Sequence, residues 1–230
     1  DPYLSRGLGD VYKRQRFLIL AQSMIDESFH IPVLTEEVID LLLIKKNGMF
    51  LDVTSGFGGH SAAILEELNG GSLIATDQDP EAIRFLKSKF KTEERISIHQ
   101  ARFSELHKLF RANDFDGILA DIGVSSYQLD TAERGFSFMK DGPLDMRMNQ
   151  NIGEDASSWL NNAQEQEISN IIWKYGEEKK AKRIAKGIVE ARKSFKIRTT
   201  KELAEIILEE TPRRFNDKKP PATKTFQAIR

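Results

Sequence analysis

Apolar residues follow two different spacings along the chain, and the alternation between them predicts the fold. Compact apolar runs of strand length occupy residues 49–53, 72–77, 96–100 and 115–121. The three-to-four-residue spacing of an amphipathic helix occurs in residues 32–44, 61–68, 80–90 and 103–110. Strands that alternate with helices predict an α/β fold in which helices cover both faces of a parallel sheet.

The pattern changes after the fourth predicted strand. Residues 126–150 are rich in Gly, Asp and Met without a regular period, which predicts a loop. Helical spacing then returns at residues 156–160, 165–175, 179–193 and 200–210. We expect these segments to form a helical unit inserted after the fourth strand.

The two ends of the chain suggest where its domains divide. Neither period is present in residues 1–22, and we interpret residues 1–15 as a non-native tail, with a natural start at Met24. The last residues, 226–230, lie within an amphipathic pattern, so we expect the natural protein to continue. The predicted division is a tail (1–22), the first part of the α/β domain (23–130), a helical insert with a loop (131–215) and the start of the return to the α/β domain (216–230).

Composition narrows the classes of function. The chain has no Cys, which excludes disulfides, thiol catalysis and Cys-ligated metals. The four His match no metal-binding spacing, and no apolar run is long enough to cross a membrane, so a cytoplasmic location is expected. Residues 179–230 carry a net charge of +10 and residues 1–178 a net charge of −11. The basic part suits a polyanionic partner, although solvated helix faces would give the same count.

A glycine-rich turn follows the first predicted strand. Its sequence runs from Thr54 through Gly56, Gly58 and Gly59 to His60, and such a turn lets a ligand approach the backbone and the free N–H groups of a helix. Asp77 ends the second strand 21 residues after Gly56, where a carboxylate can accept both hydroxyl groups of a ribose. The pattern predicts a nucleoside cofactor, either a nicotinamide dinucleotide or S-adenosylmethionine.

Two details favour S-adenosylmethionine. Asp52 precedes the glycines, where a carboxylate would repel a pyrophosphate but attract an ammonium or a sulfonium. Asp121 ends the fourth strand, at the edge where open α/β sheets bind their ligands, although a turn or a helix cap would also use an Asp there.

The motifs together resemble one family. The sequence is similar to the bacterial RsmH/MraW family of 16S rRNA cytosine-N4 methyltransferases from about residue 28 to its end. The stretches that carry the resemblance include DIGVSSYQLD at 121–130, RGFSF at 134–138, GPLDMRM at 142–148 and ATKTFQAIR at 222–230. Departures are the unmatched first 22 residues, Pro220-Pro221 where His-Pro is usual, and a missing C-terminal third of the catalytic domain.

The resemblance implies a class I, Rossmann-like, S-adenosylmethionine-dependent methyltransferase with an inserted all-helical domain. It implies methyl transfer to N4 of a cytidine in the decoding centre of 16S rRNA, within the small ribosomal subunit, without a metal. The protein would be a monomer or a homodimer. The cofactor contacts that it implies are Gly58, Gly59, His60, Asp77, Phe103, Asp121 and Gln128. Asp121, or a nearby backbone carbonyl, is the candidate proton acceptor. The candidate RNA contacts are Ser125, Ser126, Arg134, Phe136, Phe138 and Arg147.

Three other readings remain. A methyltransferase of this architecture could act on DNA or on a small molecule, although the basic final third favours a large polyanion. An RNA-binding ribosome-assembly factor without catalysis would not need S-adenosylmethionine. A nicotinamide-dependent oxidoreductase would bind NADH instead.

Overall fold

The computed structural model describes Pro32, residues 34–212 and residues 220–230. The expected tail at residues 1–22 and the proposed start at Met24 lie outside these residues. In chain order the elements are α2 (Thr35–Leu42), β1 (Met49–Asp52), α3 (Gly59–Glu67), β2 (Ser72–Asp77), α4 (Pro80–Lys89), β3 (Ile96–Gln100), the 3₁₀ helices η1 (Phe103–Lys108) and η2 (Ala112–Asp114), β4 (Gly117–Leu119), α5 (Ser126–Asp130), the 3₁₀ helix η3 (Ala132–Arg134), α6 (Ala156–Asn162), α7 (Glu165–Gly176), α8 (Ala181–Ser194), α9 (Thr200–Glu210) and α10 (Ala222–Ile229).

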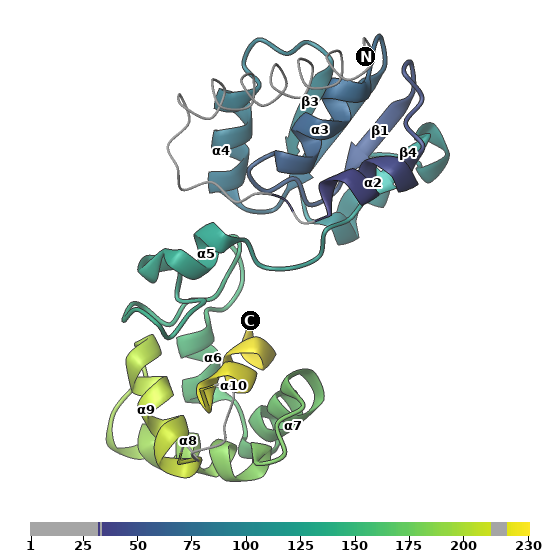
Figure 1. Ribbon diagram of the computed structural model, residues 1–230. Coiled ribbons are helices and arrows are strands. Elements are labelled where there is room, and N and C mark those ends of the chain that lie inside the picture. The colour runs from purple at the N-terminus through teal and green to yellow at the C-terminus, as the bar shows by residue number, and fades with distance from the viewer. Residues whose placement is uncertain (1–31, 33, 213–219) are drawn as a thin grey trace, which may run out of the picture.

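The four strands form one parallel sheet in the order β3-β2-β1-β4, as the alternating pattern predicts (Figure 1). Phe50 pairs with Leu73 and Leu73 with Ile96, so these three side chains share one face of the sheet. Ile64 and Leu65 of α3 pack on them and complete the core of this α/β unit. The glycine turn and Asp77 therefore meet at the carboxyl edge of the sheet, because parallel strands all end there.

The opposite face of the sheet is less covered than the sequence predicts. Leu51, Ile74, Ser97 and Ile118 share that face by their register. Leu51 is buried, but Ile118 on β4 is 46% exposed. Within the described residues, helices therefore cover one face fully and the other only in part.

Two segments differ in detail from the predictions. The segment 103–110 forms a helix as predicted, but it is the 3₁₀ helix η1 and it ends at Lys108. The expected loop after residue 126 begins with α5, which Ser125 caps: its hydroxyl accepts the N–H of Gln128, and the Gln128 side chain accepts the N–H of Ser125. This capping box is readable from the spacing of Ser125 and Gln128.

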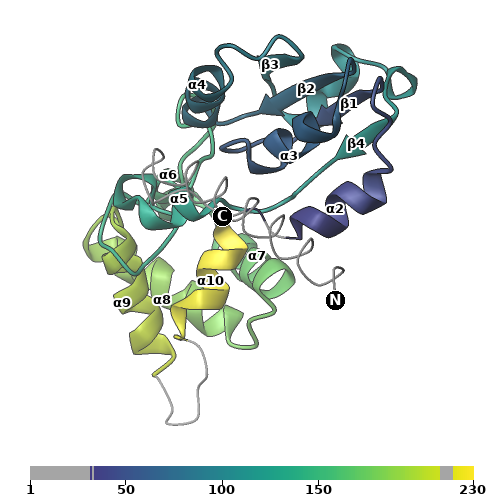
Figure 2. The ribbon, with the colours of Figure 1, turned by 45° about the horizontal axis from the view of Figure 1, so that its top comes forward.

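The remaining helices form a second unit with its own core, which lies apart from the sheet in both views (Figures 1 and 2). Helix α7 packs against α8 and α10, and α8 packs against α9. Phe226 of α10 is 2% exposed and belongs to this core. The final helix, which the sequence assigned to the return toward the α/β domain, thus packs with the helical unit because its apolar face is buried there.

Candidate cofactor and substrate site

The turn after β1 forms the floor of a cleft at the carboxyl edge of the sheet. Gly56 (φ +50°) and Gly58 (φ +71°) both adopt the left-handed conformation that glycine permits. A Cβ atom at Gly58 would come within 2.7 Å of Leu86 and Phe90, so the turn also needs glycine for space. Helix α3 begins at Gly59, directly after this turn, and Gly59 and His60 line the cleft.

Asp52 supports the turn from below. Its carboxylate accepts the hydroxyl of Ser61 at 2.7 Å and the N–H of Thr54 at 3.2 Å, and the residue is 1% exposed. Asp52 is not among the cleft-lining residues, so it does not face a ligand as the sequence suggested. Burial raises the pKa of the Asp52 carboxyl to about 6, against the opposing effect of the Ser61 and Thr54 hydrogen bonds.

We expect Asp52→Asn to stabilise the protein at pH 7. Because the folded-state pKa is raised, the contribution of Asp52 to stability is fully present below about pH 4 and is lost as the pH rises through about 6. An Asn amide can accept from Thr54 and donate to Ser61 without carrying charge. The gain at pH 7 is roughly 3 kcal/mol and vanishes toward pH 4. Unfolding free energies of both proteins between pH 4 and pH 8 provide the measurement; parallel pH profiles would contradict the assignment.

Asp77 ends β2 at the side of the cleft. One carboxylate oxygen accepts the N–H of Gly56 and the other accepts the N–H of Asp79, both at 2.8 Å. Burial raises the pKa of Asp77, and these two hydrogen bonds oppose the rise. The carboxylate is therefore held in one orientation, and each oxygen keeps a lone pair toward the cleft.

Asp121 lies across the cleft from Asp77, beyond the end of β4. Its N–H donates to the Thr54 hydroxyl at 2.7 Å, which ties the residue to the glycine turn. Its carboxylate is 48% exposed and lies 3.9 Å from Nδ1 of His60. Phe103, which opens η1, also lines the cleft, and 51% of it is exposed. An exposed ring there offers a flat apolar surface to a ligand.

The lining of the cleft is acidic. Of the described residues that line it, three are Asp (Asp77, Asp79 and Asp121) and none is Lys or Arg. The cleft thus suits a ligand that carries positive charge and hydroxyl groups, and it offers no cation to a pyrophosphate.

Comparisons with known proteins agree with this geometry. The profile of the MraW methylase family matches residues 27–230. The chain belongs to the MraW methylase family. The family's cofactor and its Rossmann-like α/β fold are those the sequence predicted, S-adenosylmethionine on a parallel sheet.

Two curated relatives carry the name ribosomal RNA small subunit methyltransferase H. The relative from Xanthomonas euvesicatoria is 48% identical over 202 residues, which are 87% of this chain and 60% of the relative. The relative from Pseudoalteromonas atlantica is 50% identical over 213 residues, 90% of this chain and 68% of the relative. The chain thus spans about 60% of the length of the first of these relatives. A crystal structure of P. horikoshii TYW2 in complex with MeSAdo aligns with 46% of this chain and 40% of its own, with 21% identity and a TM-score of 0.34.

The structure gathers most of the expected cofactor residues. Gly59, His60, Asp77, Phe103, Asp121 and Gln128 line the cleft. Gly58 lies just outside the lining and shapes the turn. Gln128 is 5% exposed, and its amide donates to the Asp79 carboxylate at 3.0 Å.

The expected RNA contacts differ in their exposure and in their distance from the cleft. Ser125 lines the cleft, and Ser126 begins α5 behind it. Arg134 is 2% exposed and Phe136 is 1% exposed. Both side chains are buried, so neither is exposed to an RNA in this structure.

The other two expected RNA contacts are engaged within the protein. Phe138 stacks edge-on against Phe226 at 5.0 Å between ring centroids. Arg147 pairs with Asp145 at 2.6 Å, and 24% of its side chain is exposed.

Gln78, Asp79 and Met148 also line the cleft and were not among the predicted site residues. Asp79 caps α4 by accepting the N–H of Glu81, a role that an Asp before Pro80 signals in the sequence. Gln78 and Met148 lie 70 residues apart, and no local pattern joins them. Within the described ranges, no group of three or more His, Asp and Glu could hold a metal ion, and no helix is long and apolar enough to cross a membrane.

Proposed function

We propose that this chain forms part of an enzyme that transfers a methyl group from S-adenosylmethionine to N4 of a cytidine in the decoding centre of 16S rRNA. The observation that carries the cofactor assignment is the acidic cleft at the carboxyl edge of the sheet. Its carboxylates match the hydroxyls and the positive charges of S-adenosylmethionine, and the described residues that line it include no Lys or Arg that would pair with the pyrophosphate of a dinucleotide. The substrate assignment rests on family membership and on the names of the two relatives.

Several of the lining residues have a role in this proposal. Asp77 accepts the ribose hydroxyls, and Phe103 lies against the adenine. Gly59 and His60 approach the methionine part from the start of α3. When bound, S-adenosylmethionine supplies a methyl group on a sulfonium.

Asp121 is the proposed proton acceptor. The N4 lone pair of cytosine is delocalised into the ring, so the amine is a weak nucleophile. A carboxylate that accepts an N4 proton helps the nitrogen become tetrahedral as the new N–C bond forms. The exposed carboxylate of Asp121 can reach a base presented at the cleft mouth. The base must leave its stack to arrive there.

A basic stripe on the helical unit is the proposed contact for the rRNA backbone. Lys182 and Lys186 are exposed and lie four positions apart on one face at the start of α8, and the exposed Lys179 lies in the turn just before this helix. Within the described part of the chain, none of the three ammonium groups has an ion-pair partner, so each can neutralise a phosphate.

We expect Asp77→Ala to weaken S-adenosylmethionine binding at least tenfold, which corresponds to about 1.4 kcal/mol. The change removes the ribose acceptor and leaves the N–H groups of Gly56 and Asp79 without their partner. Isothermal calorimetry measures the dissociation constant. Glu94→Ala, which removes an exposed carboxylate elsewhere in the α/β unit, is the matched control. An unchanged constant in the Asp77 variant would rule out the ribose assignment.

The reaction itself is tested with labelled S-adenosylmethionine and small ribosomal subunits from cells that lack this methylation. The full-length parent of this chain is assayed beside residues 1–230. We expect label in N4-methylcytidine of the decoding-centre RNA with the full-length protein. Cofactor binding without label in rRNA would contradict the substrate and leave the cofactor assignment intact. Binding of rRNA without cofactor affinity would favour an assembly factor.

A further inference from the structure

Among the described residues that line the cleft, Met148 alone comes from beyond α5. The other residues that line it lie between Pro32 and Gln128, and none of them belongs to the helical unit or its connecting loop. Met148 follows the 142–147 segment, which packs on the helical unit through the buried residues Leu144 and Met146. The cleft is therefore completed by a residue from a segment that packs on the second unit.

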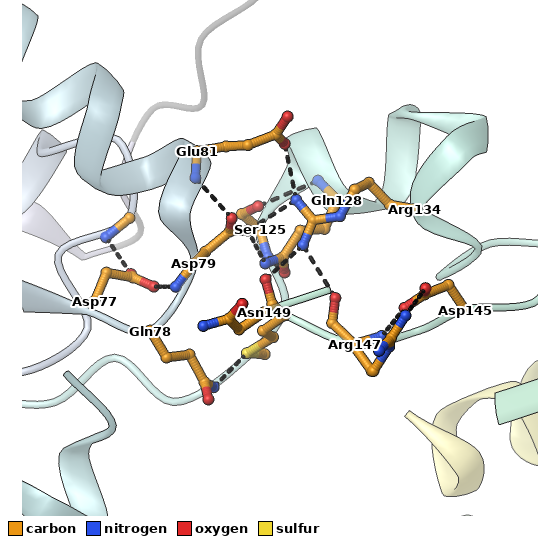
Figure 3. A network of polar contacts seen from close by, with 12 residues as sticks. Asp77, Gln78, Asp79, Glu81, Ser125, Gln128, Arg134, Asp145, Arg147 and Asn149 are labelled. Atoms are coloured by element: carbon orange, nitrogen blue, oxygen red, sulfur yellow. Dashed lines mark hydrogen bonds and ion pairs between the residues drawn. The ribbon is translucent and has the colours of Figure 1, made fainter. Parts of the chain in front are cut away.

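The thioether of Met148 lies on the adenosine side of the cleft. Its sulfur is 2.9 Å from Nε2 of Gln78, the residue directly after Asp77 (Figure 3). The Gln78 carbonyl in turn accepts from the side chain of Gln100 at the end of β3, just before Phe103 opens η1. A polarisable, partly exposed thioether in this position suits contact with an aromatic ring or a ribose.

Arg134 fixes the backbone at Met148. One guanidinium nitrogen donates to the carbonyl oxygens of Arg147 and Met148 at 3.1 and 2.8 Å. The other pairs with Asp79 at 2.8 Å and with Glu81 at 2.9 Å, and the side chain is only 3% exposed. Figure 3 shows this chain of contacts running from Asp77 through Asp79 and Arg134 to Arg147. The fork of one buried Arg thus joins the end of β2 to the Met148 segment.

The segment also carries backbone strain. Met146 adopts φ +62°, a left-handed conformation that is rare for a long side chain. Its N–H donates to the Arg134 carbonyl at 3.0 Å, and its side chain is buried. Such a conformation persists only where the surroundings fix it, and it is most often found at binding sites.

We propose that Met148 is a cofactor-contacting residue supplied by the second unit, and that Arg134 is the residue that positions it. The proposal rests on the proposed function, since it requires that the cleft takes S-adenosylmethionine. It adds that the adenosine part of the site is incomplete without the segment that Arg134 holds. Cofactor binding then favours one placement of the helical unit relative to the sheet, because the ligand touches both.

The test compares the affinities of Met148→Ala, Met148→Leu and wild type for S-adenosylmethionine and for 5′-methylthioadenosine, which lacks the amino-acid part. Calorimetry should show Met148→Ala weakening both ligands by the same factor, about five- to tenfold, as expected for loss of a buried thioether contact. Leu keeps the apolar volume and should stay within about twofold of wild type. Met139→Ala, at a 77% exposed position in the same loop region, is the matched control.

The positioning role of Arg134 is tested by a double-mutant cycle. Arg134→Lys alone should weaken 5′-methylthioadenosine binding, and it should add nothing in a Met148→Ala background. Gln78→Ala removes the other contact to Met148 and leaves Arg134 intact. Its effect should likewise be non-additive with that of Met148→Ala. This second variant provides the test if Arg134→Lys does not fold.

Four outcomes would overturn the inference. Wild-type affinity in Met148→Ala would show that Met148 does not touch the cofactor. Additive effects in both double-mutant cycles would show that neither Arg134 nor Gln78 affects binding through Met148. A loss for S-adenosylmethionine without a loss for 5′-methylthioadenosine would place Met148 outside the adenosine site. If wild type itself binds neither ligand, the proposed function fails first and the inference with it.

Discussion

Asp121→Ala is expected to lower methyl-transfer turnover by at least about a hundredfold, the lower end of what a positioned proton acceptor contributes. The Asp121 carboxylate is 48% exposed in the cleft, and the backbone N–H of Asp121 donates to the Thr54 hydroxyl. The residue is therefore held in place while its carboxylate stays accessible to a substrate. Asp121→Asn keeps the shape but loses the charge, and we expect an intermediate rate. Single-turnover assays at saturating S-adenosylmethionine separate this loss from any change in cofactor affinity.

Asp130→Ala serves as the control for this prediction. Asp130 is an exposed carboxylate at the end of α5, nine positions further along the same segment. Its removal should leave turnover unchanged. Full activity of Asp121→Ala at saturating cofactor would assign proton acceptance to another group, such as a backbone carbonyl at the cleft.

Arg134→Met is expected to destabilise the protein by about 3–5 kcal/mol, the usual cost of removing one partner from a buried ion pair. Asp79 would keep its charge in a site where its side chain is 6% exposed, with only the Gln128 amide and the Glu81 N–H as donors. The carbonyl oxygens of Arg147 and Met148 would also lose their donor. Urea unfolding monitored by fluorescence gives the free energy.

Arg84→Ala is the matched control, because Arg84 also pairs with Glu81 but is 75% exposed. Exposed pairs of this kind contribute less than about 1 kcal/mol. If Arg134→Met cost no more than Arg84→Ala, the buried network would not hold the two units together. Adding Asp79→Asn to Arg134→Met should recover part of the loss, because the unpaired charge is then gone.

The local patterns of the sequence determined several elements of both units. The strand at 72–77 and the helices opening at Pro80 and Thr200 begin where the sequence predicts. The reason is physical: apolar spacing, glycine turns and capping residues act over fewer than about ten positions, so they are visible in the chain itself. The same applies to Asp77 and to the glycine turn, whose spacing of 21 residues is that of one strand–helix–strand unit.

Only the tertiary structure decided which polar residues serve the ligand and which serve the fold. Asp52 and Arg134 looked like ligand contacts from their motifs, but Asp52 is buried under the glycine turn against Ser61, and Arg134 is buried against Asp79 from a distant part of the chain. Met148 lies in a segment predicted only as a loop, and it lines the cleft beside Gln78. The sequence does not show which way a charged group or a thioether points. The packing of the two units decides whether such a group contacts a carboxylate, a carbonyl or the open cleft. The sequence by itself determined the sheet, its glycine turn and the family; the three-dimensional packing decided how the second unit completes the site.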